Sequence, residues 1–281
     1  LLPEKVRKKS LFRIVSDMYG CGDSAENRKT IYQHIKISCR LLGNFSISCG
    51  EKCLIESDFK TRKVSGILKY LLTLDKGSVV PRERIAAVFW PDADNKSAFA
   101  SLRVALYELR KTLAMTDMSF ESENALLIEK KEGFTVNPNI MIEKDTDKLE
   151  KLYEEYRTSL KDANGEKKRK RVLEAICKIY DGEFLQGEFY DDWATVLREH
   201  YSSMYFEALY RFAQELIADD RFLCAEKQLM KGLKFEPLDE ECCKLLVETY
   251  NKSGQKNRAD HFLKKFSKHY MEEMGVELLL K

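Results

Sequence analysis

A repeat in the last third of the chain constrains the fold more than any other feature of the sequence. When the sequence is shifted by 34 residues, five apolar, small or turn-forming positions fall on positions of the same kind. The aligned pairs are Phe212 with Leu246, Leu216 with Tyr250, Asp220 with Gly254, Ala225 with Ala259 and Leu229 with Leu263. Each unit contains a helix, a tight turn and a second helix, and Pro237 ends the first unit. Two unrelated amphipathic helix pairs would rarely share this register, so the sequence predicts a true repeat of stacked helical hairpins.

The chain before this repeat is predicted to be helical as well. Beyond a break at Asn137-Pro138-Asn139, apolar stripes indicate helices around Leu149–Leu160 and Val172–Tyr180. A long helix is expected from about Asp191 to Ala218. Because the period of 34 residues is that of tetratricopeptide repeats, residues 141–281 are predicted to form an all-α, tetratricopeptide-like domain.

The first half of the chain has the pattern of strands followed by helices. Apolar and polar residues alternate from Ile35 to Leu41, the period of a half-buried strand, and the alternation resumes at Phe45. Three amphipathic helices follow, around Val64–Leu72, Pro81–Trp90 and Lys96–Leu113.

The last of these helices is expected to be capped by Asp94 or Asn95, since both side chains accept hydrogen bonds from a first helical turn. After it, two apolar runs flank the sequence Glu129-Lys130-Lys131-Glu132-Gly133, which predicts a β-hairpin with a basic tip. Residues 36–140 are therefore predicted to form an α+β domain with the element order of a winged helix.

Composition is that of a soluble protein with two domains. Of the 281 residues, 44% are hydrophobic and 33% are charged, and no stretch approaches the roughly 20 apolar residues of a membrane span. The N-terminus has no secretory pattern, so a cytoplasmic protein without a membrane partner is expected. Because the sequence begins at Leu1 without a Met, residues 1–35 are interpreted as a linker or the tail of an absent upstream domain.

The net charge of +2 is unevenly distributed along the chain. Residues 1–36 carry 8 basic and 4 acidic side chains, residues 37–140 carry 15 and 13, and residues 141–281 carry 25 and 29. The basic excess lies in the first half, where a contact with nucleic acid is therefore expected.

No enzyme, cofactor or metal site is predicted. The sequence contains no GxxxxGK[ST] phosphate loop, no GxGxxG, no HExxH and no GxSxG motif. The eight cysteines form no CxxC pair and have no histidine at a zinc-like spacing, so buried, reduced thiols are favoured over a metal site or disulfides. Adjacent Cys242 and Cys243 are interpreted as packing residues rather than as a redox sensor. None of the four histidines has a nucleophile or carboxylate arrangement that would support catalysis.

A winged helix binds DNA because its third helix fits the major groove, where each base pair presents a distinct set of hydrogen-bonding groups. The predicted outer face of the helix at 96–113 mixes donors, small residues and apolar groups that can contact a thymine methyl. The candidate recognition residues are Lys96, Ser97, Ala100, Ser101, Arg103, Val104, Tyr107 and Lys111. An ordinary solvated helix face is the alternative, and the place of the helix in the fold favours DNA contact.

Basic residues near the starts of the first two helices are candidates for contacts with the phosphate backbone, which position a protein without reading sequence. They are Lys60, Arg62, Lys63, Arg82 and Arg84. Taken singly, each fits ordinary surface charge equally well. Lys130 and Lys131 at the hairpin tip are stronger candidates, although Glu129 and Glu132 reduce the local positive potential.

Specific stretches of the chain resemble the OmpR-type winged helix of SARP-type regulators and the bacterial transcriptional activator domain that accompanies it. In the first half these are Leu42-Gly43-Asn44-Phe45-Ser46-Ile47, Lys63 to Leu72, Val80-Pro81-Arg82-Glu83-Arg84-Ile85, Phe89-Trp90-Pro91-Asp92, Leu102-Arg103 and Leu109-Arg110-Lys111-Thr112-Leu113. In the second half they are Tyr180-Asp181-Gly182-Glu183-Phe184-Leu185, Trp193 with Arg198, Ala208-Leu209, Pro237-Leu238-Asp239-Glu240 and Glu272-Glu273-Met274-Gly275-Val276-Glu277. The resemblance covers about residues 36–278.

The resemblance implies sequence-specific binding to double-stranded DNA, commonly at direct repeats near promoters, with recruitment of RNA polymerase as the output. Two departures from the family pattern stand out. About 35 residues precede the first strand, and the outer face of the third helix is less basic than in many members because it carries Ala100, Val104 and Tyr107. Modest affinity for a single site is therefore expected, which makes tandem or homodimeric binding more important.

Two functions remain open from the sequence. The first is a transcriptional regulator whose repeat domain serves intramolecular control, dimerisation or contact with polymerase, under an effector or an upstream signalling domain. The second is a protein-interaction scaffold whose winged helix no longer binds DNA, which the near-neutral charge of residues 37–140 keeps open.

Overall fold

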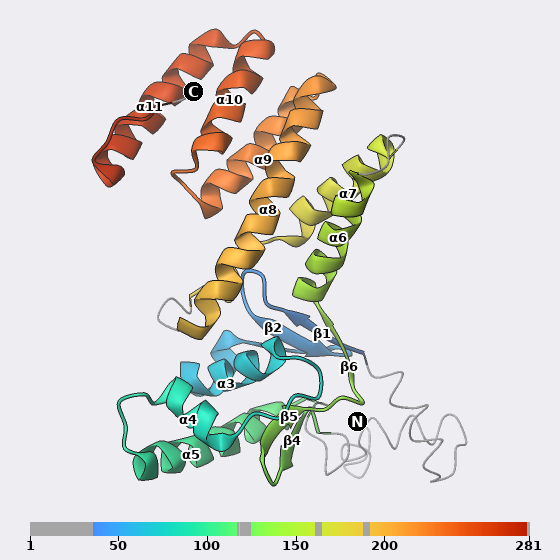
Figure 1. Ribbon diagram of the computed structural model, residues 1–281, viewed down its shortest axis with the longest axis vertical. Helices are drawn as coiled ribbons and strands as arrows, with labels where there is room; N and C mark the ends of the chain where they lie inside the picture. Colours follow the sequence, from blue (N-terminus) through green and yellow to red (C-terminus); the bar gives the residue numbers. More distant parts are fainter. Residues whose placement is uncertain (1–35, 117, 119–124, 161–164, 188–191, 280–281) are drawn as a thin grey trace, which may run out of the picture. The chain divides into compact units, whose positions relative to one another are not determined.

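The computed structural model describes residues 36–116, 118, 125–160, 165–187 and 192–279 of the chain. The chain divides into two compact units, Leu1–Lys144 and Asp145–Lys281 (Figure 1). The linker or tail predicted at 1–35 lies outside the described residues, as do Cys21 and His34.

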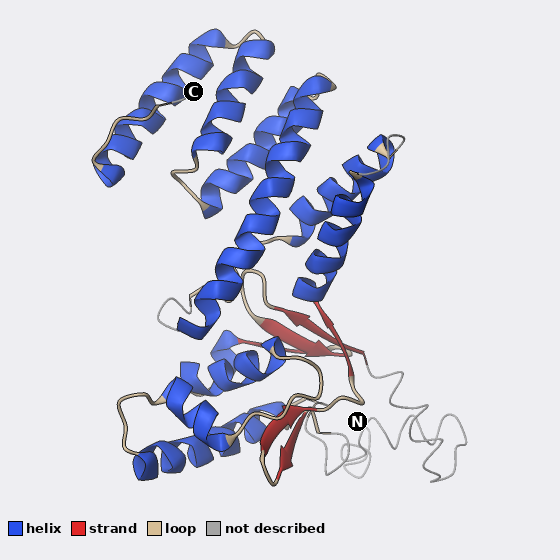
Figure 2. Cartoon of the chain, in the orientation of Figure 1, coloured by secondary structure: helices blue, strands red, loops and turns tan. Residues whose placement is uncertain are grey.

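The first unit begins with a four-stranded sheet in the order β3-β2-β1-β6 (Figure 2). Its strands are β1 (Lys36–Arg40), β2 (Ser46–Cys49), β3 (Lys52–Ile55) and β6 (Met141–Lys144). Antiparallel pairing of β1, β2 and β3 agrees with the alternation of apolar residues, because Ile37, Cys39, Ile47 and Leu54 are all buried.

Strand β6 differs from the sequence-based prediction, which made the chain nearly all helical after residue 139. Met141–Lys144 instead pairs in parallel with β1, with Ile142 opposite Ile37. A four-residue strand is too short to show a period. Its stability comes from pairing with a segment about a hundred residues earlier in the chain, which no local pattern reports.

Three helices and a second, two-stranded sheet complete this unit. The helices are α3 (Arg62–Thr73), α4 (Arg82–Phe89) and α5 (Asn95–Leu113), with a short 3-10 turn η2 (Glu56–Asp58) before them. The hairpin consists of β4 (Leu127–Lys130) and β5 (Gly133–Val136).

The three helices meet on apolar faces. Ile67, Leu71, Ile85 and Leu109 are each at most 2% exposed, which places them in the centre of the core. Helices α3 and α4 approach closely because residue 66 is glycine: a Cβ there would lie 2.8 Å from the ring of Phe89.

The second unit is entirely helical among its described residues. Its helices are α6 (Asp145–Ser159), α7 (Glu166–Ile179), α8 (Asp192–Ala218), α9 (Phe222–Phe235), α10 (Glu240–Lys252) and α11 (Lys256–Met274). Each helix packs mainly on its neighbours in sequence, as expected for stacked helical hairpins (Figure 1).

The 34-residue repeat is visible in the turns between paired helices. Asp220 and Gly254, which the repeat aligns, both have left-handed backbone conformations, with φ of 57° and 78°. The same hydrogen bond closes both turns: Arg221 N donates to Leu216 O over 2.9 Å, and Gln255 N donates to Tyr250 O over 2.8 Å. The predicted fold class, an α+β winged helix followed by an all-α tetratricopeptide-like domain, is confirmed.

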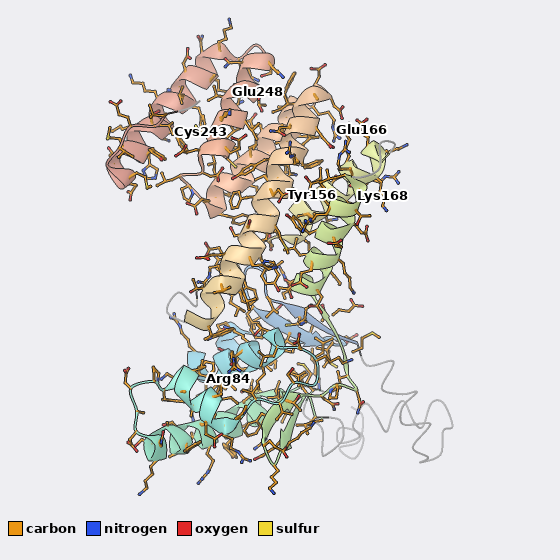
Figure 3. All side chains as sticks on the ribbon, in the orientation of Figure 1. Arg84, Tyr156, Glu166, Lys168, Cys243 and Glu248 are labelled. Carbon is orange, nitrogen blue, oxygen red and sulfur yellow. The ribbon has the colours of Figure 1, made fainter. Side chains whose placement is uncertain are left out.

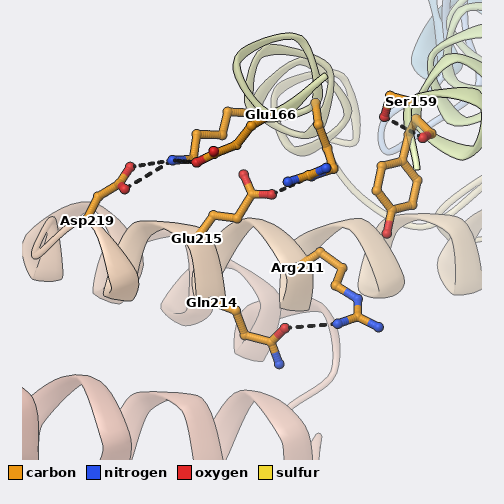
Figure 4. A network of polar contacts seen from close by, with 9 residues as sticks. Ser159, Glu166, Arg211, Gln214, Glu215 and Asp219 are labelled. Atoms are coloured by element: carbon orange, nitrogen blue, oxygen red, sulfur yellow. Dashed lines mark hydrogen bonds and ion pairs between the residues drawn. The ribbon is translucent and has the colours of Figure 1, made fainter. Parts of the chain in front are cut away.

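Helices α7 and α8 are joined by a row of ion pairs. Lys170 Nζ lies 2.9 Å from both Glu166 Oε1 and Asp219 Oδ2, and Arg169 Nε donates to Glu215 Oε1 over 2.8 Å (Figure 4). The pairs Lys170–Asp219 and Arg169–Glu215 connect the two helices, whereas Lys170–Glu166 lies within α7.

The cysteines of the helical unit mostly belong to its core. Cys242 and Cys243 are fully buried in α10, and Cys243 packs with Phe266 and Tyr270 of α11 (Figure 3). Burial raises the pKa of Cys177 and of Cys243 to about 12, so both are thiols at neutral pH. Their interpretation as packing residues agrees with this environment, whereas Cys224 is exposed.

Candidate nucleic-acid interface

Helix α5 begins at a cap that the sequence predicts as one of two residues. The structure selects Asp94, whose side chain accepts hydrogen bonds from Lys96 N over 3.0 Å and Ser97 N over 3.1 Å. These hydrogen bonds, with Ser97 as the largest contributor, hold the pKa of Asp94 below its ordinary value. The cap fixes where the helix starts and therefore which residues lie on each face.

The inner face of α5 is buried as predicted. Ala98, Leu102, Ala105, Leu106, Leu109 and Leu113 are all at most 6% exposed. They recur at helical spacing and anchor α5 to the rest of the first unit.

The outer face of α5 is open to solvent. Seven of the eight candidate recognition residues are exposed, and Ser101 is partly buried; the exposed ones are Lys96, Ser97, Ala100, Arg103, Val104, Tyr107 and Lys111. Val104 is 61% exposed and Tyr107 64% exposed, and both lie in the middle of the helix. Cationic donors thus flank an apolar centre on a surface one helix wide.

The hairpin β4–β5 has a two-residue turn. Lys130 pairs with Gly133, which leaves Lys131 and Glu132 at the tip, and all three charged side chains are exposed. The predicted wing residues Lys130 and Lys131 therefore project from the end of the hairpin.

Strand β5 is joined, close to the turn of the hairpin, to the segment before α4. Val80 and Phe134 exchange two backbone hydrogen bonds of 2.8 and 2.9 Å. Gly133 lies so close to this segment that an added Cβ would be 1.9 Å from the carbonyl oxygen of Val80. Only glycine fits this approach, so residue 133 fixes the position of the hairpin.

A second connection joins the hairpin to both α4 and α5. Glu129 Oε1 accepts from Arg82 Nη2 over 2.7 Å, and Glu129 Oε2 accepts from Arg110 Nη2 over 2.6 Å. Both guanidinium groups also lie over the ring of Phe134, at 5.5 and 6.0 Å from its centroid. We call these four residues the Glu129 clasp.

The electrostatics of the Glu129 clasp follow from its geometry. The hydrogen bond from Arg82, together with the weaker contribution of Arg110, holds the pKa of Glu129 below its ordinary value. The clasp borders a cavity of about 320 Å³ between α5 and the hairpin, which Arg103 and Phe99 also line. The clasp thus fixes the spacing between the predicted recognition helix and the predicted wing.

The five basic residues that are candidates for contacts with the DNA backbone differ in whether they have partners within the first unit. Lys60 forms a 2.8 Å ion pair with Glu108, Lys63 Nζ lies 5.1 Å from the centroid of the Trp90 ring, and Arg82 belongs to the Glu129 clasp. Arg62 is exposed, as is Arg84, which is labelled in Figure 3, and neither forms an ion pair with any residue that the structure describes.

Arg110 of α5 has its ion-pair partner outside its own helix. The structure pairs it with Glu129 of the hairpin, while Glu108 pairs with Lys60. The sequence contained one signal for the clasp, which is an acidic residue, Glu129, just before the basic tip of the hairpin. It did not indicate which arginines pair with Glu129.

Neither a metal-binding cluster nor a membrane-spanning helix is present in the part of the chain that the structure describes. No group of three or more His, Cys, Asp and Glu side chains there could hold a metal ion. None of the described helices combines the length and apolarity that a membrane crossing requires.

Comparison with known proteins gives two findings. Residues 144–279 match the family named bacterial transcriptional activator domain. The structure of Mycobacterium tuberculosis EmbR in complex with a low-affinity phosphopeptide is similar, with a TM-score of 0.60 and 16% sequence identity over 87% of this chain. The chain spans 62% of the EmbR chain, so it corresponds to less than two thirds of that protein. No protein of curated function matches the sequence significantly.

The family match confirms the resemblance to a bacterial transcriptional activator domain that the motifs of the second half indicate, and the similarity to EmbR shows a shared fold. The helical unit corresponds closely to the matched family region, which begins at Lys144. The matched family is one of transcriptional activators.

Proposed function

Starting from the premise that residues 144–279 are a bacterial transcriptional activator domain, we propose that the chain binds specific double-stranded DNA through the winged helix preceding that domain. The observation that carries this proposal is the outer face of α5, on which Val104 and Tyr107 are exposed between cationic residues. Large apolar side chains on a solvated helix face bury no apolar surface, whereas on a helix in the major groove they can contact thymine methyl groups.

Within this proposal, α5 reads bases and the hairpin contacts the backbone. Lys96, Arg103 and Lys111 supply hydrogen-bond donors for base edges or adjacent phosphates, and the small side chain of Ala100 permits close approach. Lys130 and Lys131 project from the hairpin tip toward the flanking phosphates or minor groove. Arg62 and Arg84, which form no ion pair with described residues, are the better candidates for further phosphate contacts.

The proposed output is activation of transcription. The chain would bind direct repeats near promoters, as tandem copies or a homodimer, and contact RNA polymerase. Because Ala100, Val104 and Tyr107 occupy positions on the outer face of α5 where stronger donors could lie, affinity for an isolated half-site should be modest. Binding to two adjacent sites should raise the effective concentration of the second copy. An effector or an upstream signalling domain would provide the input.

Footprinting on the chain's own upstream region, followed by fluorescence anisotropy with the protected duplex, tests the proposal. The affinity of the 281-residue chain should fall steeply as salt rises, because phosphate contacts release counterions. Arg103→Ala should weaken binding to the specific duplex by about tenfold and reduce discrimination against mismatched duplexes. Lys264→Ala, at an exposed position of α11, is the charge-matched control and should leave affinity unchanged.

A protein-interaction scaffold without DNA binding is the second candidate function. It is favoured by one observation: Lys60, Lys63 and Arg82 already have partners within the first unit, so less positive charge faces outward than the sequence suggests. If the chain is not retained on duplex DNA at low salt and retains a peptide partner instead, this second function replaces the first.

A further inference from the structure

The helical unit contains an open groove that the DNA-binding proposal does not use. It has a volume of about 770 Å³ and lies between α7 and α9, both of which pack on α8. Lys178 lines it from α7, and Leu223, Lys227, Met230, Lys231 and Lys234 line it from α9.

The α9 side of this groove is a single helical stripe. Leu223, Lys227, Met230 and Lys234 are spaced at i, i+4, i+7 and i+11, which places them on one face of α9. The stripe extends over about 16 Å at 1.5 Å per residue. Leu223 is 78% exposed and Met230 is 41% exposed, so two apolar side chains seven residues apart border the same hollow.

One lysine of the groove has a structural role. Lys231 Nζ donates to the backbone carbonyls of Cys177 over 2.8 Å and of Tyr180 over 2.6 Å, which ties α9 to the end of α7. Its partial burial lowers the pKa of its ammonium group, as expected for a cation held at an apolar floor. Lys231 therefore holds the two sides of the groove together, and it is not one of the lysines proposed to contact a ligand.

The rim of the groove is cationic. Lys178, Lys227 and Lys234 are exposed and form no ion pair with any described residue. Two carboxylates also line the groove, but Glu226 is already bound by Arg258, whose Nη2 lies 2.5 Å from Glu226 Oε1. Of the two carboxylates that line the groove, only Glu174 is left to oppose the three lysines. The groove therefore has a local excess of positive charge, although residues 141–281 as a whole are net negative.

We propose that the groove between α7 and α9 binds an acidic, amphipathic helical segment of a partner protein. Two apolar side chains of the segment, about seven residues apart, pack on Leu223 and Met230. Its carboxylates pair with Lys178, Lys227 and Lys234. The groove is long enough for three helical turns, and apolar anchors at i and i+7 are the pattern by which a helix is recognised in a groove.

DNA is the less suitable occupant, because a phosphate backbone has no apolar surface to place against Leu223 and Met230. The proposal is independent of the winged helix: it holds whether or not α5 binds DNA.

Selection from a displayed library of random 16-residue peptides tests the inference with the 281-residue chain as bait. The Lys227→Glu/Lys234→Glu variant serves as the counter-selection bait. Enriched peptides should be net negative with apolar residues seven apart. Enrichment of neutral or basic peptides, or no enrichment above the bare support, overturns the proposal.

Fluorescence anisotropy with an enriched peptide then locates its site. Leu223→Ser and Lys227→Glu/Lys234→Glu should each weaken binding by about tenfold or more. Lys264→Glu/Lys265→Glu, at exposed positions of α11, carries the same charge change and should bind like the wild type. If Lys227→Glu/Lys234→Glu and Lys264→Glu/Lys265→Glu lose peptide affinity equally, the effect is one of non-specific charge and the assignment of the peptide to the groove is overturned.

Measuring the duplex DNA affinity of the same variants distinguishes a peptide from DNA as the occupant of the groove. The groove variants should retain wild-type DNA affinity, and the Arg103→Ala variant should bind the peptide like the wild type although its DNA affinity is weakened. If Lys227→Glu/Lys234→Glu loses DNA affinity while Leu223→Ser does not, the groove is an electrostatic site for DNA and the peptide proposal fails. Circular dichroism of each variant establishes that it is folded.

Discussion

The two units of this chain are stabilised by contacts of different range. In the winged helix, segments far apart in the sequence meet: β1 pairs with β6, Val80 pairs with Phe134, and Glu129 of the hairpin joins Arg82 of α4. In the helical unit, each helix packs mainly on its sequence neighbours, and the turns at Asp220 and Gly254 repeat one hydrogen-bonding pattern.

This difference shows where each unit is vulnerable. The position of the hairpin depends on a few contacts around Gly133 and Glu129, so one substitution can displace a whole element of the candidate DNA interface. Stability in a helical repeat is spread over successive similar interfaces, so a change at one turn should remain local.

The largest expected effect comes from Gly133→Ala. The added Cβ would lie 1.9 Å from a backbone oxygen of Val80, which cannot move without breaking the hairpin junction. We expect a loss of about 2 kcal/mol or more in the stability of the first unit. Hydrogen exchange measured by mass spectrometry should show deprotection in residues 125–136, and DNA affinity should fall with it.

The matched change in the helical unit is Gly254→Ala. Its φ of 78° disfavours alanine, but no heavy atom lies within 4 Å of the added Cβ, so a cost of about 1 kcal/mol is expected. Equal losses of protection in the two variants would refute the contrast between the units.

A smaller effect is expected from Glu129→Gln, which removes the carboxylate that holds Arg82 and Arg110. Both arginines are about half exposed, so their ion pairs should contribute less than about 1 kcal/mol to stability. The change should act mainly on DNA binding: the two released cations should raise affinity for random duplex DNA by roughly threefold to tenfold at low salt and steepen its salt dependence. Specificity should fall, because the hairpin is no longer fixed relative to α5.

Glu132→Gln is the control for this variant, since it removes the same charge at the exposed hairpin tip. It should produce a smaller rise in affinity and no loss of specificity. If the two variants behave alike, the clasp contributes only charge and has no positioning role.

The clasp should also make the first unit sensitive to acid. The pKa of Glu129 is depressed in the folded state below its ordinary value of 4.5, so its stabilising contribution is complete above that value. The contribution is lost as the pH falls through the depressed pKa. Wild type and Glu129→Gln should therefore differ in denaturant midpoint at pH 7, and the difference should shrink as the pH falls below 4.5. A constant difference across this range would contradict the assignment.

The smallest expected effect is an exchange between the two equivalent turns of the repeat. Asp220→Gly relieves a non-glycine residue with φ of 57° and should stabilise the helical unit by about 0.5 kcal/mol. Gly254→Asp should destabilise it by a similar amount, because it introduces the same strain. Urea midpoints of both variants check this, and changes of the same sign would show that the two turns are not equivalent.

Much of the fold was predictable from local patterns. The stripe at Val64–Leu72, the start of the second helix at Pro81 and the cap before Lys96 all correspond to observed features of α3, α4 and α5. The 34-residue repeat predicted the turns at Asp220 and Gly254 because their positions depend on residues close in sequence.

The candidate site was predictable only in part. Burial of one face of α5 determined that Val104 and Tyr107 are exposed, since the apolar period of a helix defines both of its faces. The partners of Arg82 and Lys60 could not be read from the sequence, because each lies about fifty positions away and many carboxylates were equally available.

The sequence by itself determined which segments are helices and strands, which faces are apolar, and that the last helices repeat, because these properties depend on periodicities of a few residues and on self-similarity. Only the tertiary structure decided that Met141–Lys144 joins the sheet, that Glu129 binds two arginines, and that Leu223 and Met230 border a cationic groove. Those features arise where segments distant in the chain come together, and the free energy of such contacts depends on three-dimensional proximity that no local pattern encodes.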